Sequence, residues 1–298
     1  MKNVSKYIIL LLFVLFGISK TIQAQNSAIN RAIAYQQAGD LDKAKGAIDS
    51  AVINPISAND PYAWYVKGYI YKSIYSKKEA GKRKVDIRKE AMAAFLKSKE
   101  IDTKGENNED NNKNIKYIAT TYFNDAVQSI DSTNYQFAIE AYELYRKAIV
   151  IPEPATDITK KDIDFNLALA SMYTRAYEAN RKGKVDFFAK AKEAYGKVIT
   201  LDANNVSANY NLGILYYNQA VSIINAMDYD LDLVTLNQIQ DDCVVLFKQS
   251  LPFMEKAYQL DPKRKETLIG LSGIYFSLNE EEKSKEIKLK IDEIDQNK

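Results

Sequence analysis

The chain has 298 residues, a formal net charge of +2 and a hydrophobic content of 46%, values typical of an ordinary folded protein rather than a disordered one. A net charge this close to zero gives no reason to expect a nucleic-acid partner or direct adsorption to a membrane. Histidine is absent from the sequence, which excludes Ser–His–Asp and Cys–His catalysis and histidine-ligated metal sites. Glycine-rich phosphate-binding motifs are also absent. We therefore predict a protein that is not an enzyme and has no cofactor and no metal site.

Residues 1–24 have the pattern of a signal peptide. Two lysines precede an apolar run from Tyr7 to Gly17, which is long enough for a signal-peptide core and too short to span a bilayer. Ala24 then precedes Gln25 at a suitable cleavage junction. We expect an exported mature chain, residues 25–298, in the periplasm, in the cell envelope or secreted. The alternative is an uncleaved membrane anchor.

Beyond this segment one pattern occurs six times. Its first half carries a small residue and, three positions later, a tyrosine: Ala32/Tyr35, Gly68/Tyr71, Ala119/Tyr122, Ala170/Tyr173, Gly213/Tyr216 and Ser272/Tyr275. Its second half begins with another small residue and has a bulky residue four positions later in all but the last copy; the small residues are Ala44, Ala91, Ala138, Ala191, Ser250 and Ser284. Small residues let neighbouring helices approach closely. Turn residues follow the second half, so each copy predicts a hairpin of two helices, A and B.

The pattern resembles the tetratricopeptide repeat, a helical hairpin of about 34 residues. The segment from Trp64 to Tyr71 (W-x3-G-x2-Y) and the sequence YQLDP at 258–262 match that family most closely. The resemblance implies an all-α, right-handed solenoid of about six hairpins, which we place at about 26–55, 60–102, 113–152, 161–202, 205–262 and 264–295.

Four central hairpins depart from the family by insertions between the helix A tyrosine and the helix B small residue. The inserted residues are mostly helix formers, so we expect extra turns on both helices and hairpins longer than those at the ends. In the fifth hairpin Asp228, Asp230 and Asp232 alternate like the start of a calcium loop. The glycine and the later glutamate of such a loop are missing, so we interpret the segment as a polar turn with a helix-capping aspartate.

The resemblance further implies that helix A residues line a concave face that binds an extended peptide. Carried over position by position, the partner-binding residues are Tyr62, Tyr65, Tyr69, Lys72, Lys116, Phe123, Asn124, Arg175, Tyr210, Tyr217 and Asn218. Tyrosines supply large contact area, and amides can bond a peptide backbone. The alternative is that some of these tyrosines pack against the lengthened neighbouring helices. The family's carboxylate clamp is not expected, because Thr120 stands where the clamp needs asparagine.

Three further segments give narrower expectations. The basic segment 77–89 would suit an anionic lipid or glycan surface, or is a solvated helix extension. Residues 102–112 are expected to be a polar loop, and the single cysteine, Cys243, a buried apolar residue.

The sequence as a whole predicts a non-catalytic interaction scaffold of the cell envelope that binds a peptide or protein partner in a tyrosine-rich groove. The alternative is a structural or assembly subunit of an envelope machine for secretion or outer-membrane biogenesis. Membrane association is expected only through partners or through an uncleaved N-terminal segment.

Overall fold

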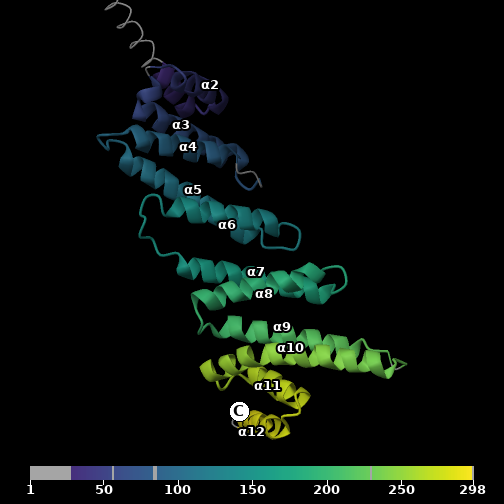
Figure 1. Ribbon diagram of the computed structural model, residues 1–298. Helices are drawn as coiled ribbons and strands as arrows, with labels where there is room; N and C mark the ends of the chain where they lie inside the picture. The colour runs from purple at the N-terminus through teal and green to yellow at the C-terminus, as the bar shows by residue number, and fades with distance from the viewer. Residues whose placement is uncertain (1–27, 56, 83–85, 229, 297–298) are drawn as a thin grey trace, which may run out of the picture. The chain divides into compact units, whose positions relative to one another are not determined.

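The computed structural model describes residues 28–55, 57–82, 86–228 and 230–296 (Figure 1). The predicted signal peptide and its cleavage junction lie outside these residues. In the described ranges the regular structure is entirely helical, and the chain divides into two compact units. The first unit comprises Met1–Ser129 and Gln136–Thr156, and the second comprises Ile130–Tyr135 and Asp157–Lys298.

The first unit contains three hairpins in chain order. A helix over residues 28–37 turns through Gly39, whose positive φ of 80° suits glycine, into the next helix. The helices that follow are α2 (Leu41–Val52), α3 (Pro61–Ile74) with a π-helical turn at Tyr75–Glu79, α4 (Asp86–Ile101), α5 (Asn108–Gln128) and α6 (Tyr135–Ile149). Helix α3 packs against α2 and α4, and α5 contacts both α3 and α4.

The second unit also contains three hairpins. They are α7 (Thr159–Ala179) with α8 (Val185–Leu201), α9 (Val206–Asn225) with α10 (Leu233–Leu260), and α11 (Lys265–Ser277) with α12 (Glu281–Gln296). Helix α9 packs against α8 on one side and contacts α11 on the other, while α11 also packs against α10. Within each unit, neighbouring hairpins therefore pack on one another, which is the arrangement of an all-α helical-repeat fold.

The helix lengths confirm elongation most clearly in the fourth and fifth hairpins. Helices α7, α9 and α10 have 21, 20 and 28 residues, whereas α2 and α11 have 12 and 13. Helices α3, α4 and α6 have 14, 16 and 15 residues and are no longer than α12, which has 16. The inserted segments between helix A and helix B are mainly extra helical turns, as their helix-forming composition predicted.

The small residues of the repeat pattern are all buried, which confirms its phase. Among the alanines and serines of the pattern the most exposed is Ser272, at 5%, and the alanines are fully buried. Two glycines are required by close packing: a Cβ on Gly68 would lie 2.6 Å from the Phe95 ring, and one on Gly213 would lie 2.5 Å from Cγ of Met254. Helix B presses its bulky residue onto the small residue of helix A.

The segment at 102–112, predicted to be a loop, is partly helical because α5 begins at Asn108. The Asp102 carboxylate accepts hydrogen bonds from the backbone N–H groups of Glu106 and Asn107, at 3.2 and 2.7 Å, and so fixes the turn. Asn111 is fully buried, and its amide donates to Oγ of Ser98 at 2.9 Å. The polar residues of segment 102–112 therefore form specific hydrogen bonds at the junction between two hairpins. The prediction that the whole segment is a loop was wrong, because its second part belongs to α5.

The basic segment also differs from its expectation. Lys77, Lys78 and Lys89 are exposed, and residues 83–85 lie outside the described part of the chain. Arg88, however, is fully buried rather than solvated. The physical reason is that its guanidinium stacks on the rings of Tyr75, in the π-helical turn, and Tyr122, in α5. It also pairs with the Asp125 carboxylate of α5.

Asp232 caps α10, as predicted: its carboxylate accepts from the backbone N–H groups of Val234 and Thr235, both at 3.0 Å. Within the described ranges, no three acidic or cysteine side chains are grouped so that they could hold a metal ion. The same ranges contain no helix with both the length and the apolar character needed to cross a bilayer.

Candidate functional site

Three tyrosines form a row along α3. The helix is capped at its start by Asp60, whose carboxylate accepts from the Tyr62 backbone N–H at 2.9 Å. Tyr62, Tyr65 and Tyr69 then recur at helical spacing on one face, with 6.0 and 6.3 Å between successive ring centroids. Tyr62 is 45% exposed and Tyr69 36% exposed, while Tyr65 is half-buried against the Phe95 ring. The row is thus anchored at its middle and open at both ends.

The row lines a groove of about 240 Å³ between α3 and the first helix, residues 28–37. The first helix contributes Ile33 and two adjacent amides, Gln36 and Gln37. Val66 and Ile70 of α3 complete the lining. The groove therefore combines an apolar base with phenol and amide groups that can both donate and accept hydrogen bonds.

A cation lies at the end of the row nearer to α5. The Lys72 ammonium donates to Oδ1 of Asn114 at 2.6 Å and lies 4.4 Å from the centroid of the Tyr69 ring and 5.3 Å from that of Tyr117. Burial lowers the pKa of the Lys72 amine. The Tyr117 hydroxyl is hydrogen-bonded to Ser76 at 2.9 Å, so the polar surface continues from α3 onto α5.

The remaining predicted residues of the first unit are not part of this row. Lys116 is exposed, and its ammonium lies 3.7 Å from the Glu153 carboxylate. Phe123 is half-buried and contacts the rings of Tyr142 and Tyr145, with centroid distances of 6.3 and 5.1 Å. Its ring therefore takes part in the packing of its own hairpin. Asn124, the next residue, is exposed.

In the second unit, Tyr210 and Tyr217 mainly serve packing. The Arg264 guanidinium stacks 3.8 Å from the Tyr210 ring centroid, and burial raises the pKa of Tyr210. Tyr217 contacts Phe247, and a Cβ on Gly273 would lie 2.5 Å from the Tyr217 hydroxyl. Tyr217 thus fills the space between α9, α10 and α11, as the alternative interpretation of the tyrosines expected.

The two polar candidates of the second unit lie on α7 and α9. The Asn218 amide donates to Oε1 of Glu178 at 3.1 Å and so links the two helices. Arg175 is exposed on α7. Neither extends the tyrosine row, which belongs to the other unit.

Sequence reasoning missed four residues that the structure brings to the tyrosine row: Gln36, Gln37, Asn114 and Tyr117. The glutamines directly follow the helix A tyrosine of the first hairpin, at the repeat positions that Lys72 and Ser73 hold in the second hairpin, so the same spacing would have indicated them. Tyr117 stands one residue after the predicted Lys116. A step of one residue rotates a side chain by about 100° around a helix, so a small error in phase selects the wrong face.

Comparison with known proteins adds little to this geometry. No protein-family model matches the chain, and no curated protein matches its sequence. Among solved structures it is similar to Pseudomonas aeruginosa PilF, at 11% identity over 93% of this chain and 98% of that one, with a TM-score of 0.32. It is also similar to the TPR2AB domain of yeast Sti1 in complex with pHSP90, at 13% identity over 92% of each chain, with a TM-score of 0.31.

A third similar structure is human IFIT1 with m7Gppp-AAAA, at 16% identity and a TM-score of 0.30. That match covers 88% of this chain and 58% of IFIT1, so the chain spans less than two thirds of that protein. The identities and scores are low, and the helical-repeat assignment therefore rests on the hairpins and buried anchors of the chain itself.

Proposed function

We propose that the protein is a non-catalytic interaction scaffold whose tyrosine-lined groove binds an extended segment of a partner protein. The proposal rests on the row on α3, where Tyr62 and Tyr69 expose large aromatic surface in a groove that Gln36 and Gln37 also line. Aromatic side chains that stay in water contribute little to the fold, whereas tyrosine is enriched at the energetic centres of protein interfaces.

The dimensions of the row suggest what it holds. From Tyr62 to Tyr69 the helix rises by about 10 Å, which equals the length of about three residues of extended chain. Gln36 and Gln37 stand across the groove, where they can bond a peptide backbone. The Lys72 ammonium, which uses one of its three donors on Asn114, favours an acidic group at that end. We therefore propose a short extended segment with apolar side chains and an acidic end.

The test uses a double variant, Tyr62→Ala with Tyr69→Ala. Both residues are exposed, so we expect the melting temperature to remain close to that of the unchanged protein. Truncated interface tyrosines often cost about 2 kcal/mol each, a loss of roughly 30-fold in affinity per residue. Affinity capture from envelope extracts with quantitative mass spectrometry should therefore show one or more partners lost.

The matched control is Val127→Ala with Ile139→Ala, two exposed apolar residues of the same unit that do not line the groove. The control should retain every partner. A double tyrosine variant that keeps its fold and captures the same proteins as the unchanged chain would overturn the proposal.

We also propose export to the cell envelope, which rests on the signal-peptide pattern of residues 1–24. The mass of the protein isolated from the envelope or the medium should correspond to a chain that begins at Gln25. A chain that retains Met1 in the membrane fraction would contradict release as a mature protein.

A further inference from the structure

The last hairpin leaves the outer half of α10 uncovered. Helix α10 has 28 residues and α11 has 13. At about 1.5 Å per residue they are roughly 42 and 20 Å long. Helix α11 packs against α10 and ends at Ser277, and the free ends of α9 and α10 extend beyond that end (Figure 1). The first half of α10 therefore lacks the neighbour that the second half has.

An apolar groove of about 300 Å³ occupies this uncovered position. Its α10 wall includes Leu236, Ile239, Cys243 and Phe247, which recur at helical spacing. Ile224 at the end of α9 and Ser277 at the end of α11 close it. Cys243 and Phe247 are buried at 3% exposure and belong to the core of the unit, whereas Leu236 is 39% exposed. The core stripe thus continues along α10 into solvent without a covering element.

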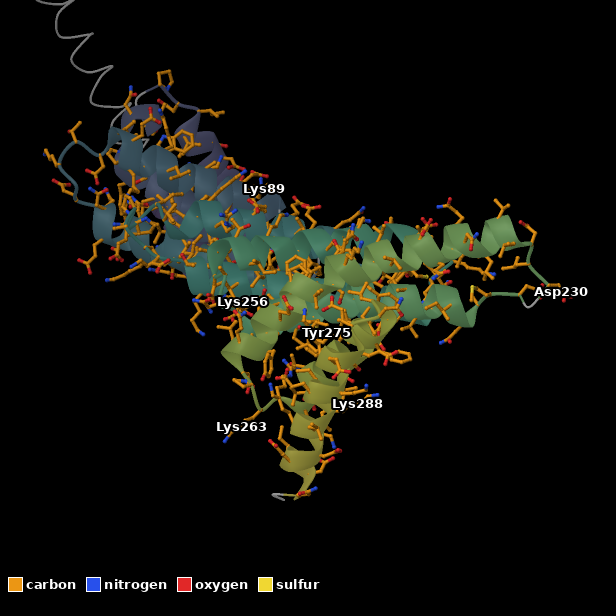
Figure 2. The ribbon with its side chains drawn as sticks, turned by 60° about the horizontal axis from the view of Figure 1, so that its bottom comes forward. Lys89, Asp230, Lys256, Lys263, Tyr275 and Lys288 are labelled. Carbon is orange, nitrogen blue, oxygen red and sulfur yellow. The ribbon has the colours of Figure 1, made fainter. Side chains whose placement is uncertain are left out.

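No charged residue lines the groove, and the α9–α10 hairpin that carries most of its lining is acidic. The sequence contains no lysine or arginine between Lys197 and Lys248, a stretch that includes the whole α9–α10 turn. Five aspartates stand in the turn and in the first half of α10: Asp228, Asp230, Asp232, Asp241 and Asp242. Figure 2 shows Asp230 at the outer end of this hairpin. Among the ion pairs formed by the described residues, none involves these five carboxylates.

We propose that this acidic groove docks an amphipathic helix of a partner protein whose apolar face is flanked by lysine or arginine. A helix fits because the wall repeats at helical spacing and because the groove continues past the end of α11. The uncovered part of α10, residues 233–246, is about 21 Å long, which sets the length of the docked helix at roughly four turns. The aspartates of the α9–α10 turn and of α10 favour basic flanks and speed association with a cationic segment. This surface is separate from the tyrosine row and does not depend on the function proposed for it.

The experiment measures binding of a fluorescent 14-residue helical peptide made of leucine and lysine, with leucines on one face. The matched peptide replaces every lysine with glutamate. Fluorescence anisotropy with the full mature chain should detect the lysine peptide, with an affinity that falls as salt is added, and no binding of the glutamate peptide. The Tyr62→Ala/Tyr69→Ala variant should bind the lysine peptide as the unchanged chain does.

Two variants locate the site. Leu236→Ala with Ile239→Ala removes exposed or half-exposed apolar groups and should weaken binding about tenfold or more. Asp241→Asn with Asp242→Asn should weaken it several-fold and flatten its salt dependence. The controls are Leu289→Ala and Glu281→Gln with Glu282→Gln, exposed residues of α12 outside the groove.

Three results would overturn the proposal. The first is equal binding of the glutamate peptide, or of the lysine peptide to the groove variants. The second is a dimer in solution that the Leu236/Ile239 variant abolishes, because the groove would then hold a second copy. The third is adsorption to anionic lipid vesicles that is lost in the same variant.

Discussion

The outer ends of the second and fifth hairpins, where helix A turns into helix B, differ in what lies beside them. At the end of α3 and the start of α4, the buried Arg88 guanidinium lies 4.4 Å from the ring centroids of both Tyr75 and Tyr122. It pairs with the Asp125 carboxylate at 2.6 Å and also donates to Thr121 at 3.2 Å. At the end of α9 and the start of α10, by contrast, apolar side chains of α10 line an open groove.

The difference shows that a lengthened helix does not by itself create a binding surface. Helix α5 has 21 residues and reaches far enough to supply Tyr122 and Asp125 to Arg88. Helix α11 has 13 residues and ends at Ser277, so it has no residue to set against Leu236. A surface stays open where the following hairpin is short.

Replacing Arg88 with alanine should lower the free energy of unfolding, because the contacts between the outer end of the second hairpin and α5 are lost. Removing one partner of a buried charge pair typically costs about 3–5 kcal/mol, because the other charge stays buried without compensation. Lys89→Ala is the control: its ion pair with Glu140, at 2.9 Å, is about half exposed and should contribute less than about 1 kcal/mol. Chemical denaturation of both variants measures the difference. Equal losses would show that Arg88 is not a structural element of this junction.

Adding a methyl group should have opposite effects at two helical glycines. Gly68→Ala forces a Cβ to within 2.6 Å of the Phe95 ring and should destabilise the protein by about 1–3 kcal/mol. A Cβ on Gly196, within α8, meets nothing within 4 Å, so Gly196→Ala should stabilise it by up to about 1 kcal/mol through helix propensity. Thermal melting of the two variants gives the signs. Equal shifts would mean that the small-residue positions do not govern hairpin packing.

Tyr122→Phe should have the smallest effect at neutral pH, about 1 kcal/mol or less, because the buried hydroxyl has no hydrogen-bond partner among the described residues. Burial raises the pKa of Tyr122 to about 12, so the folded state retains the phenolic proton above the ordinary pKa of about 10. The stability linked to this proton is complete below about pH 10 and is lost as the pH rises to about 12. Between about pH 10 and pH 12 the melting temperature of the Tyr122→Phe variant should therefore rise relative to that of the unchanged protein. A difference in melting temperature that does not vary with pH over this range would contradict the burial of the Tyr122 hydroxyl.

The repeat architecture could be predicted from sequence because its determinants are local. The small residue and the tyrosine three positions later recur in phase, and burial of Ala119 and Tyr122 follows from that spacing alone. The environment of Arg88 could not be predicted, because its partners are distant in the sequence. Tyr75 lies 13 positions before Arg88, and Asp125 lies 37 positions after it. Its place in a basic run suggested the opposite, a solvated side chain.

The tyrosine row was found from the spacing of Tyr62, Tyr65 and Tyr69 on one helix. Its neighbours on α5 were not found, because Asn114 and Tyr117 share a face of α5 that lies about 100° around the helix from Lys116. The apolar groove of the fifth hairpin was also beyond sequence reasoning. It depends on where α11 ends relative to α10, which a helical pattern in either segment does not specify.

Site-specific photo-crosslinking in cells that make the protein would show directly whether the tyrosine row contacts a partner. A photoreactive phenylalanine analogue would replace Tyr62 or Tyr69 in the groove, or Val127 or Ile139 as controls on the same unit. We predict discrete crosslinked products from positions 62 and 69 and none from positions 127 and 139. Products from the control positions alone, or equally from all four, would contradict the account.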